Sequence, residues 1–106
     1  MLKSEERKIL KRFKAEVEKI LGNRLDRVVL FGSRSRGDAD SESDFDLLVI
    51  VRNLEKTDRQ RVFDIAADLS LDYGTVLAVL VLPAKDFTED RYFYLYENIQ
   101  KEGQVV

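Results

Sequence analysis

The 106-residue sequence contains no cysteine and no histidine, and each absence excludes a class of chemistry. Without cysteine, the chain has no disulfide framework, no thiol nucleophile and no thiolate metal site. Without histidine, it lacks the commonest general base and the usual zinc ligand. Any acid–base or metal chemistry therefore has to use carboxylates, whose oxygen atoms suit magnesium or manganese.

The sequence also lacks a strong positive charge and a long apolar run. Its formal net charge is −2, so no overall positive field favours nucleic acid as a partner. No apolar run approaches the roughly 20 residues that span a bilayer, and the charged, helix-patterned residues 1–14 are unlike a secretory signal. With 44% apolar and 36% charged residues, the sequence predicts a single globular domain over residues 1–106, cytoplasmic and without a membrane partner.

The apolar pattern alternates between helices and short buried strands. Helical spacing predicts helices over residues 4–21, 58–72 and 90–102. Continuous apolar runs at 27–31, 45–51 and 76–82 predict buried strands. This order of elements predicts an α/β fold of the α+β type, with a short mixed sheet of about three core strands flanked by helices.

Two aspartates, Asp44 and Asp46, stand at the head of the second apolar run. Residues two apart on a strand project from the same face, while Phe45 points to the other face. Neighbouring carboxylates repel each other, and the pKa of one of them rises unless a cation neutralises the pair. The pair therefore predicts a divalent metal site. The alternative is a solvated acidic loop that runs into a strand, because three further acids lie between residues 38 and 42.

The turn before the acids has the sequence GSRSRG over residues 32–37. Gly32 lets the backbone approach a phosphate closely, Ser33 adds a hydroxyl, and the next N–H groups can open a short anion-binding helix. Arg34 and Arg36 can reach phosphate oxygens, and for each of them a solvated surface position is an equal alternative. The turn lacks the lysine of a Walker-type loop and is not interpreted as one.

Together, Gly32-Ser33, the ten intervening residues 34–43 and Asp44-x-Asp46 resemble the signature of the minimal nucleotidyltransferase family, within the polymerase-β-like superfamily. The resemblance implies a nucleotidyltransferase fold that brings the turn beside the acids. It implies Asp44 and Asp46 as catalytic metal ligands for Mg²⁺ or Mn²⁺, and a nucleoside triphosphate, expected to be ATP, as donor. The turn residues implied to bind the nucleotide are Gly32, Ser33, Arg34 and Arg36. The implied reaction transfers a nucleoside monophosphate, AMP from ATP, to a hydroxyl of a protein or a small molecule.

One departure from the family pattern leaves a second interpretation open. Active members usually carry a third carboxylate on the next core strand, and the run at 76–82 contains none. Asp72 and Asp86 flank that run and would have to reach the site from unexpected positions. The alternative function is a catalytically silent nucleotide-binding module, or an antitoxin-like module that acts by protein interaction.

The aromatic cluster YFYLY at 92–96 lies in the last predicted helix. Helical spacing predicts that Tyr92, Phe93, Tyr96 and Ile99 pack against the sheet while Tyr94 turns elsewhere. An association surface is the alternative, since aromatic side chains are enriched at interface centres. The small size of the chain predicts a homodimer or a partner protein. The resemblance implies a helical HEPN-type toxin as that partner, with this chain as the antitoxin.

Overall fold

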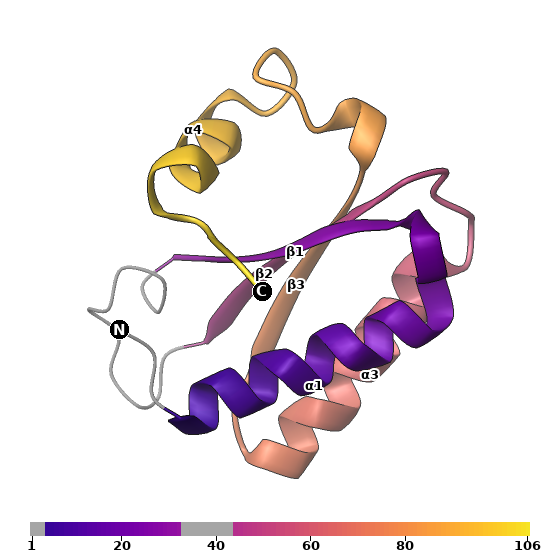
Figure 1. The fold of residues 1–106 in the computed structure, drawn as a ribbon, viewed down its shortest axis with the longest axis vertical. Helices are drawn as coiled ribbons and strands as arrows, with labels where there is room; N and C mark the ends of the chain where they lie inside the picture. The colour runs from indigo at the N-terminus through magenta and orange to yellow at the C-terminus, as the bar shows by residue number, and fades with distance from the viewer. Residues whose placement is uncertain (1–3, 33–43) are drawn as a thin grey trace.

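A four-stranded sheet separates two layers of helices in the computed structural model, which describes residues 4–32 and 44–106 (Figure 1). The elements alternate along the chain much as the apolar pattern predicts. In chain order they are α1 Ser4–Leu21, η1 Gly22–Arg24, β1 Leu25–Phe31, β2 Phe45–Val51, α3 Asp58–Tyr73, β3 Leu77–Pro83, η2 Ala84–Asp86, α4 Phe93–Glu102 and β4 Gln104–Val105.

The sheet is mixed, and its strand order is β3-β2-β1-β4. β2 pairs with β1 in antiparallel fashion and with β3 in parallel fashion. β4 pairs with β1 in antiparallel fashion and was not expected from the sequence. A strand of two residues is too short to show a period, which is why the sequence did not reveal β4. The three predicted core strands are confirmed.

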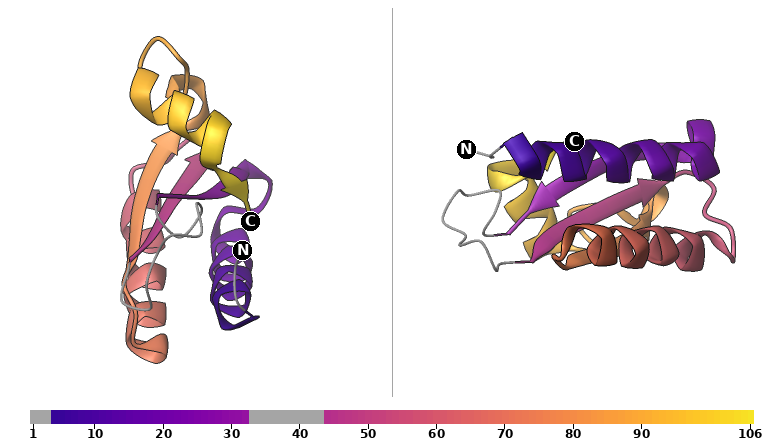
Figure 2. Two further views of the ribbon diagram at one scale, coloured as in Figure 1. Left: turned by 90° about the vertical axis from the view of Figure 1, so that its left-hand side faces the viewer. Right: turned by 90° about the horizontal axis from the view of Figure 1, so that it is seen from below.

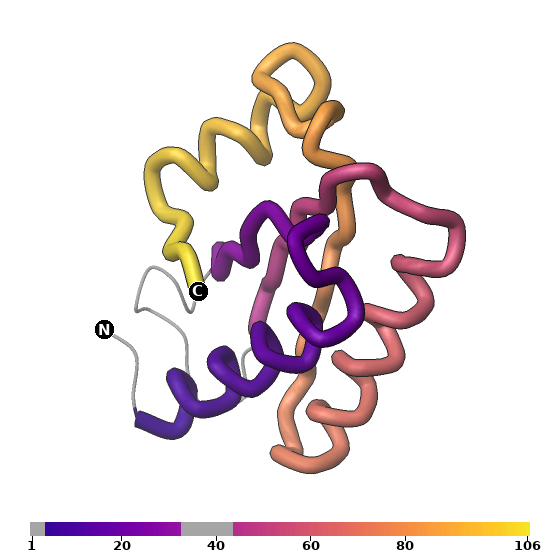
Figure 3. Tube along the Cα trace, turned by 45° about the vertical axis from the view of Figure 1, so that its right-hand side comes forward, coloured from indigo at the N-terminus to yellow at the C-terminus, as the bar shows by residue number. Residues whose placement is uncertain are grey.

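The central position of β2 explains why residues 47–51 are apolar on both faces. One face of the sheet packs against α1 and α3, and the other packs against α4, as Figures 2 and 3 show. Side chains of β2 alternate between the two hydrophobic clusters: Leu47 and Val49 belong to the first, Leu48 and Ile50 to the second. Because both faces of β2 are covered, a polar side chain on this strand fits only near its ends.

Helix α4 differs in one respect from the expectation. Ile99 is buried, and Tyr92 and Tyr96 pack half-buried on the second cluster, whereas Phe93 is 51% exposed. The prediction that Phe93 packs against the sheet is therefore wrong. The helix begins at Phe93 instead of residue 90, and the Phe93 ring makes an edge contact with the exposed Tyr94 ring, with 5.4 Å between centroids.

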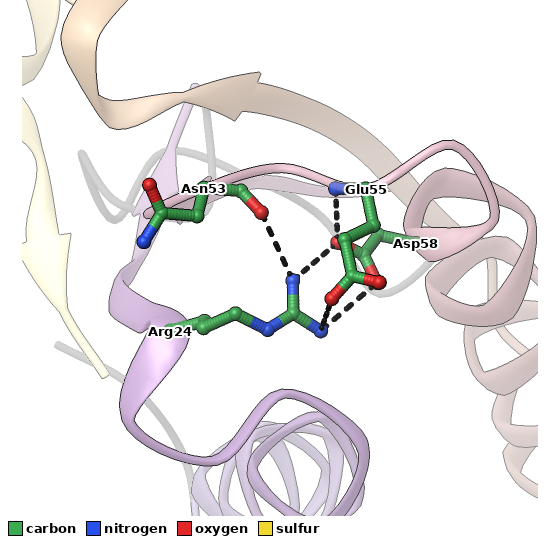
Figure 4. A network of polar contacts seen from close by, with 4 residues as sticks. All are labelled: Arg24, Asn53, Glu55 and Asp58. Atoms are coloured by element: carbon green, nitrogen blue, oxygen red, sulfur yellow. Dashed lines mark hydrogen bonds and ion pairs between the residues drawn. The ribbon is translucent and has the colours of Figure 1, made fainter.

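A buried ion pair closes the sheet at the end where β1 begins and β2 finishes (Figure 4). Asp58 is only 1% exposed, and Arg24 donates to its two carboxylate oxygens at 2.6 and 3.2 Å. The Glu55 N–H donates to Oδ2 of Asp58 at 2.7 Å, and Arg24 also donates to the Asn53 carbonyl at 3.3 Å. The hydrogen bonds from Arg24 lower the pKa of Asp58 despite its burial. This cluster ties η1 to the β2–α3 connection.

Candidate functional site

The turn and the acid pair meet at the opposite end of the β1–β2 ladder. Phe31 pairs with Asp46 across the two strands, so Gly32 follows directly beside the Asp46 side chain. Gly32 has φ of +77°, and a Cβ added there would collide with Oδ2 of Asp46 and lie 3.1 Å from its Cγ. Only glycine permits both this backbone conformation and this approach. The carboxylate therefore occupies the space that a side chain at position 32 would need.

The two aspartates lie where β2 begins. Phe45 is buried against α1 and α3, and its N–H donates to the Val76 carbonyl at 2.9 Å. Strand alternation turns the half-buried Asp46 to the opposite face of the sheet, where α4 lies farther along the strands. Asp44 is exposed and lies immediately before the strand. The strand end thus places the half-buried Asp46 carboxylate on the face of the sheet opposite α1 and α3, with the exposed Asp44 two residues before it.

Three predicted nucleotide-binding residues, Ser33, Arg34 and Arg36, lie outside the described residues. The phosphate contacts predicted for them stay predictions. Gly32 is the part of the turn that the structure places beside an acid.

The residue across from Asp46 on β3 is Ala78, in the parallel register. Its neighbours on the same face, Val76 and Leu80, are apolar as well, so β3 brings no third carboxylate to Asp46. Within residues 4–32 and 44–106, no three acidic side chains lie close enough together to hold a metal ion. The absence of an acid from the run at 76–82 is visible in the sequence. That Ala78 is the neighbour of Asp46 is not, because an apolar run does not reveal strand register.

Neither flanking acid substitutes for the missing one. Asp72 lies in α3, in the helical layer on the other face of the sheet, and forms an ion pair with Arg12 at 3.5 Å. Asp86 lies in η2, beyond the point where β3 pairs with the far end of β2, and forms an ion pair with Arg91 at 3.6 Å. These positions agree with the expectation that Asp72 and Asp86 lie away from the place where the family carries its third carboxylate.

The donor set at the strand end fits a hard divalent cation. It consists of carboxylates only, and magnesium in proteins is commonly held by one or two carboxylates together with phosphate oxygens of the substrate. Strand β3 has no polar side chain, so it adds no competing ligand.

No helix among the described residues is both long and apolar enough to cross a membrane.

Comparison with known proteins adds sequence relatives to this geometry. The family model described as a nucleotidyltransferase domain matches residues 6–106. Two Methanocaldococcus jannaschii proteins provisionally named protein adenylyltransferases are similar to this chain. One is 40% identical over 74 residues, covering 69% of this chain and 75% of the relative. The other is 31% identical over 101 residues, covering 95% and 97%.

Solved structures share the fold at lower identity. A structure provisionally described as a minimal nucleotidyltransferase has a TM-score of 0.57 and 23% identity, and the match covers 94% of both chains. A toxin–antitoxin structure with AMP-PNP has a TM-score of 0.59 and 19% identity, over 90% of this chain and 70% of that one. A Shewanella oneidensis structure of a tri-AMPylated HEPN toxin with an MNT antitoxin has a TM-score of 0.53 and 18% identity, over 94% and 69%.

The fold of these structures agrees with the mixed sheet and flanking helices described above. The family match covers nearly the whole chain, including the strand ends that carry Gly32, Asp44 and Asp46. The chain therefore belongs to the nucleotidyltransferase domain family, as the spacing of its Gly-Ser turn and its aspartate pair indicated.

Proposed function

We propose that this protein is a magnesium-dependent nucleotidyltransferase that transfers AMP from ATP to a hydroxyl group of a protein or a small molecule. The observation that carries the proposal is the contact between Gly32 and the Asp46 carboxylate, in a chain that matches the nucleotidyltransferase domain. The relatives provisionally named protein adenylyltransferases support AMP as the transferred group and a protein as the acceptor.

Asp44 and Asp46 would hold Mg²⁺ or Mn²⁺. When bound, the ion stabilises negative charge on the transferring phosphoryl group and lowers the pKa of the acceptor hydroxyl. Asp44 is exposed and Asp46 is half-buried, so the pair combines one ligand that solvent reaches freely with one that the fold holds in place. Asp46 is positioned by its strand and by the glycine beside it.

Gly32 has no side chain, which lets its backbone lie against the Asp46 carboxylate and, in this proposal, also approach a phosphate closely. Ser33, Arg34 and Arg36 are proposed to contact the triphosphate. In the reaction, a bond forms between the acceptor oxygen and the α-phosphorus, and the bond from that phosphorus to the β-phosphate oxygen breaks. Pyrophosphate leaves with the electron pair of the broken bond. Since the chain has no histidine, a carboxylate, a phosphate oxygen or water accepts the hydroxyl proton.

We further propose a helical HEPN-type protein as the acceptor and partner, with a homodimer of this chain as a separate assembly. The fold similarity to a structure in which a tri-AMPylated HEPN toxin is in complex with an MNT antitoxin supports this choice. The partner would supply the hydroxyl group, and this chain would supply the metal ligands and the nucleotide site.

The test uses ATP labelled at the α- or the γ-phosphate, Mg²⁺ and a HEPN-type protein as the acceptor. The proposal predicts that the α-label and not the γ-label appears on the acceptor. Asp46→Asn should lower the rate by about 100-fold or more, since it removes a preorganised charge at the reacting phosphate. Asp68→Asn is the matched control, because Asp68 is an exposed acid on α3, on the other side of the sheet. Equal α-labelling by the wild type and Asp46→Asn would contradict the proposal.

A second candidate function is favoured by one observation, the alanine that β3 places across from Asp46. Without a third acid, the chain would act as a binding module that neutralises its partner by contact. Tight binding of the HEPN-type protein without α-labelling, and unchanged by Asp46→Asn, would support this function over the first.

A further inference from the structure

Strand β3 forms one edge of the sheet, and half of its backbone groups face away from β2. The Phe45 N–H donates to the Val76 carbonyl, and Phe45 pairs with Leu77. In a parallel ladder, this register turns the even-numbered residues of β3 toward β2. The N–H and C=O groups of Leu77, Val79 and Val81 therefore point outward.

Two side chains of α3 satisfy outward groups at the two ends of this edge. The Leu77 N–H donates to Oγ of Ser70 at 3.1 Å, and Nε of Arg59 donates to the Val81 carbonyl at 3.2 Å. Within residues 4–32 and 44–106, four outward groups between these ends have no hydrogen-bond partner: the Leu77 carbonyl, both groups of Val79 and the Val81 N–H. The middle of the edge is thus available for another strand.

These four groups complement themselves under a two-fold axis at Val79. In an antiparallel pair centred there, Val79 of each copy lies opposite Val79 of the other, and the two residues exchange both hydrogen bonds. Leu77 lies opposite Val81 of the second copy, whose N–H donates to the Leu77 carbonyl. The other two groups of that pair, the Leu77 N–H and the Val81 carbonyl, are those that Ser70 and Arg59 already satisfy. A second strand would occupy the positions of these two side-chain atoms, so the pairing replaces the hydrogen bonds from Ser70 and Arg59 with backbone ones and leaves no outward group of Leu77, Val79 or Val81 without a partner.

Exposed apolar side chains flank this edge. Phe63 of α3 is 40% exposed and lies one turn after Arg59, the residue that reaches the edge. On the other face of the sheet, Leu80 is 41% exposed. In the two-fold register, Leu80 lies opposite the small Ala78 of the second copy, so a large side chain meets a small one. Burying these apolar surfaces favours association.

We infer that two copies of this chain pair through β3 in antiparallel fashion around Val79, forming one sheet continuous through both copies. The pairing has a consequence for the candidate site. Ala78 lies beside Asp46, so Leu80 of the second copy stands on the far side of Ala78 and closes that flank of the acid pair with an apolar side chain. The inference concerns assembly alone, and its tests use neither nucleotide nor metal, so it can fail independently of the proposed reaction.

Sedimentation equilibrium over a range of protein concentrations measures the association. The wild type is expected to form a dimer, and Leu80→Lys and Phe63→Lys are each expected to raise its dissociation constant by about tenfold or more, as loss of a central apolar contact does. Leu71→Lys is the matched control, because Leu71 is 84% exposed on the same helix but lines the groove toward α1. It should leave the dissociation constant unchanged.

The register is tested by a cysteine at the two-fold axis. The chain has no cysteine, so Val79→Cys introduces a single thiol. Across a hydrogen-bonded antiparallel pair, the Cα atoms lie about 5.5 Å apart, within the range that a disulfide spans. Mild oxidation should give a covalent dimer of Val79→Cys and none of Leu71→Cys.

Hydrogen exchange provides a readout on the unaltered protein. The amides of Val79 and Val81 should exchange more slowly as the protein concentration rises, whereas that of Leu77, already bonded to Ser70, should change less. A wild-type chain that stays monomeric at every concentration would overturn the inference. So would a dimer that Leu80→Lys leaves intact and that Val79→Cys does not cross-link.

Discussion

The two ends of the β1–β2 ladder treat their acidic side chains in opposite ways. At one end, Asp58 is almost fully buried, and Arg24 and the Glu55 N–H bind its carboxylate. At the other end, Asp44 is exposed and Asp46 is half-buried against a glycine. The first arrangement neutralises the buried Asp58 carboxylate with the Arg24 guanidinium and stabilises the fold. The second keeps carboxylates accessible at a strand end, which is what binding of an external cation requires.

This contrast separates the effects of substitution at the two ends. A change at Asp58 should affect folding and leave transfer by the folded protein unaltered. A change near Asp46 should affect transfer and leave folding nearly unaltered.

Asp58→Asn should destabilise the fold by about 3 kcal/mol, because it leaves the Arg24 guanidinium beside a neutral partner in a largely buried site. For a chain of this length, such a loss lowers the melting temperature by roughly 10 °C or more. Denaturant unfolding measures it. Asp64→Asn, at an exposed position of the same helix, serves as the control. An unchanged midpoint, or a loss of AMP transfer in the folded fraction, would remove the distinction between the two ends.

Gly32→Ala should lower the rate of AMP transfer by about 30-fold, because its Cβ would displace the Asp46 carboxylate by an ångström or more. Gly22→Ala is a close control. Gly22 has φ of +57°, so alanine there carries a similar backbone cost of roughly 1 kcal/mol, but nothing lies within 4 Å of the added Cβ. Both variants should lose similar stability in thermal unfolding, and only Gly32→Ala should lose activity. Equal rates for the two variants would argue against a role for the Gly32–Asp46 contact.

Ala78→Asp should raise the rate of AMP transfer by about tenfold, because it places a third carboxylate across from Asp46 on the same face of the sheet. The added negative charge should also make the melting temperature more dependent on Mg²⁺ than in the wild type. Ala78→Asn, with the same shape and no charge, should do neither. A slower Ala78→Asp variant that still binds nucleotide would show that two carboxylates already complete the site.

The smallest expected effect is the dependence of stability on acid pH. Arg24 lowers the pKa of Asp58 below its ordinary value of 3.8, so the ionised form is favoured in the folded state. This contribution is fully present above the unfolded pKa and is lost as the pH falls through the folded one. The free energy of unfolding, measured from pH 6 to pH 2, should therefore fall below about pH 4. Asp58→Asn should show a shallower decline, and parallel curves for the two proteins would contradict this assignment.

The sequence was sufficient for the order of the elements, which follows from local signals, the apolar runs and the turns between them. The meeting of Gly32 with Asp46 was expected because this part of the sequence resembles the signature of the minimal nucleotidyltransferase family. The neighbour of Asp46 on β3 was not predictable, because every register of the run at 76–82 buries similar side chains. The Arg24–Asp58 pair was not predictable either, since an acid in the first turn of a helix is ordinarily exposed, and its partner lies far away in the sequence.

The position of Phe93 shows a different limit. A helical pattern predicts which residues share a face, but it does not tell where the helix begins or how far the sheet beneath it extends. Because α4 begins at Phe93, that side chain contacts Tyr94 instead of the core.

The most direct test of the acid pair as a magnesium–nucleotide site is calorimetric titration with α,β-methylene-ATP, in which the bond to be cleaved is replaced. The wild type should bind this analogue only when Mg²⁺ is present. Asp46→Asn should weaken binding by about 30-fold or more, while Asp68→Asn should bind as the wild type does. Binding that needs no divalent cation, or that Asp46→Asn leaves unchanged, would contradict the account.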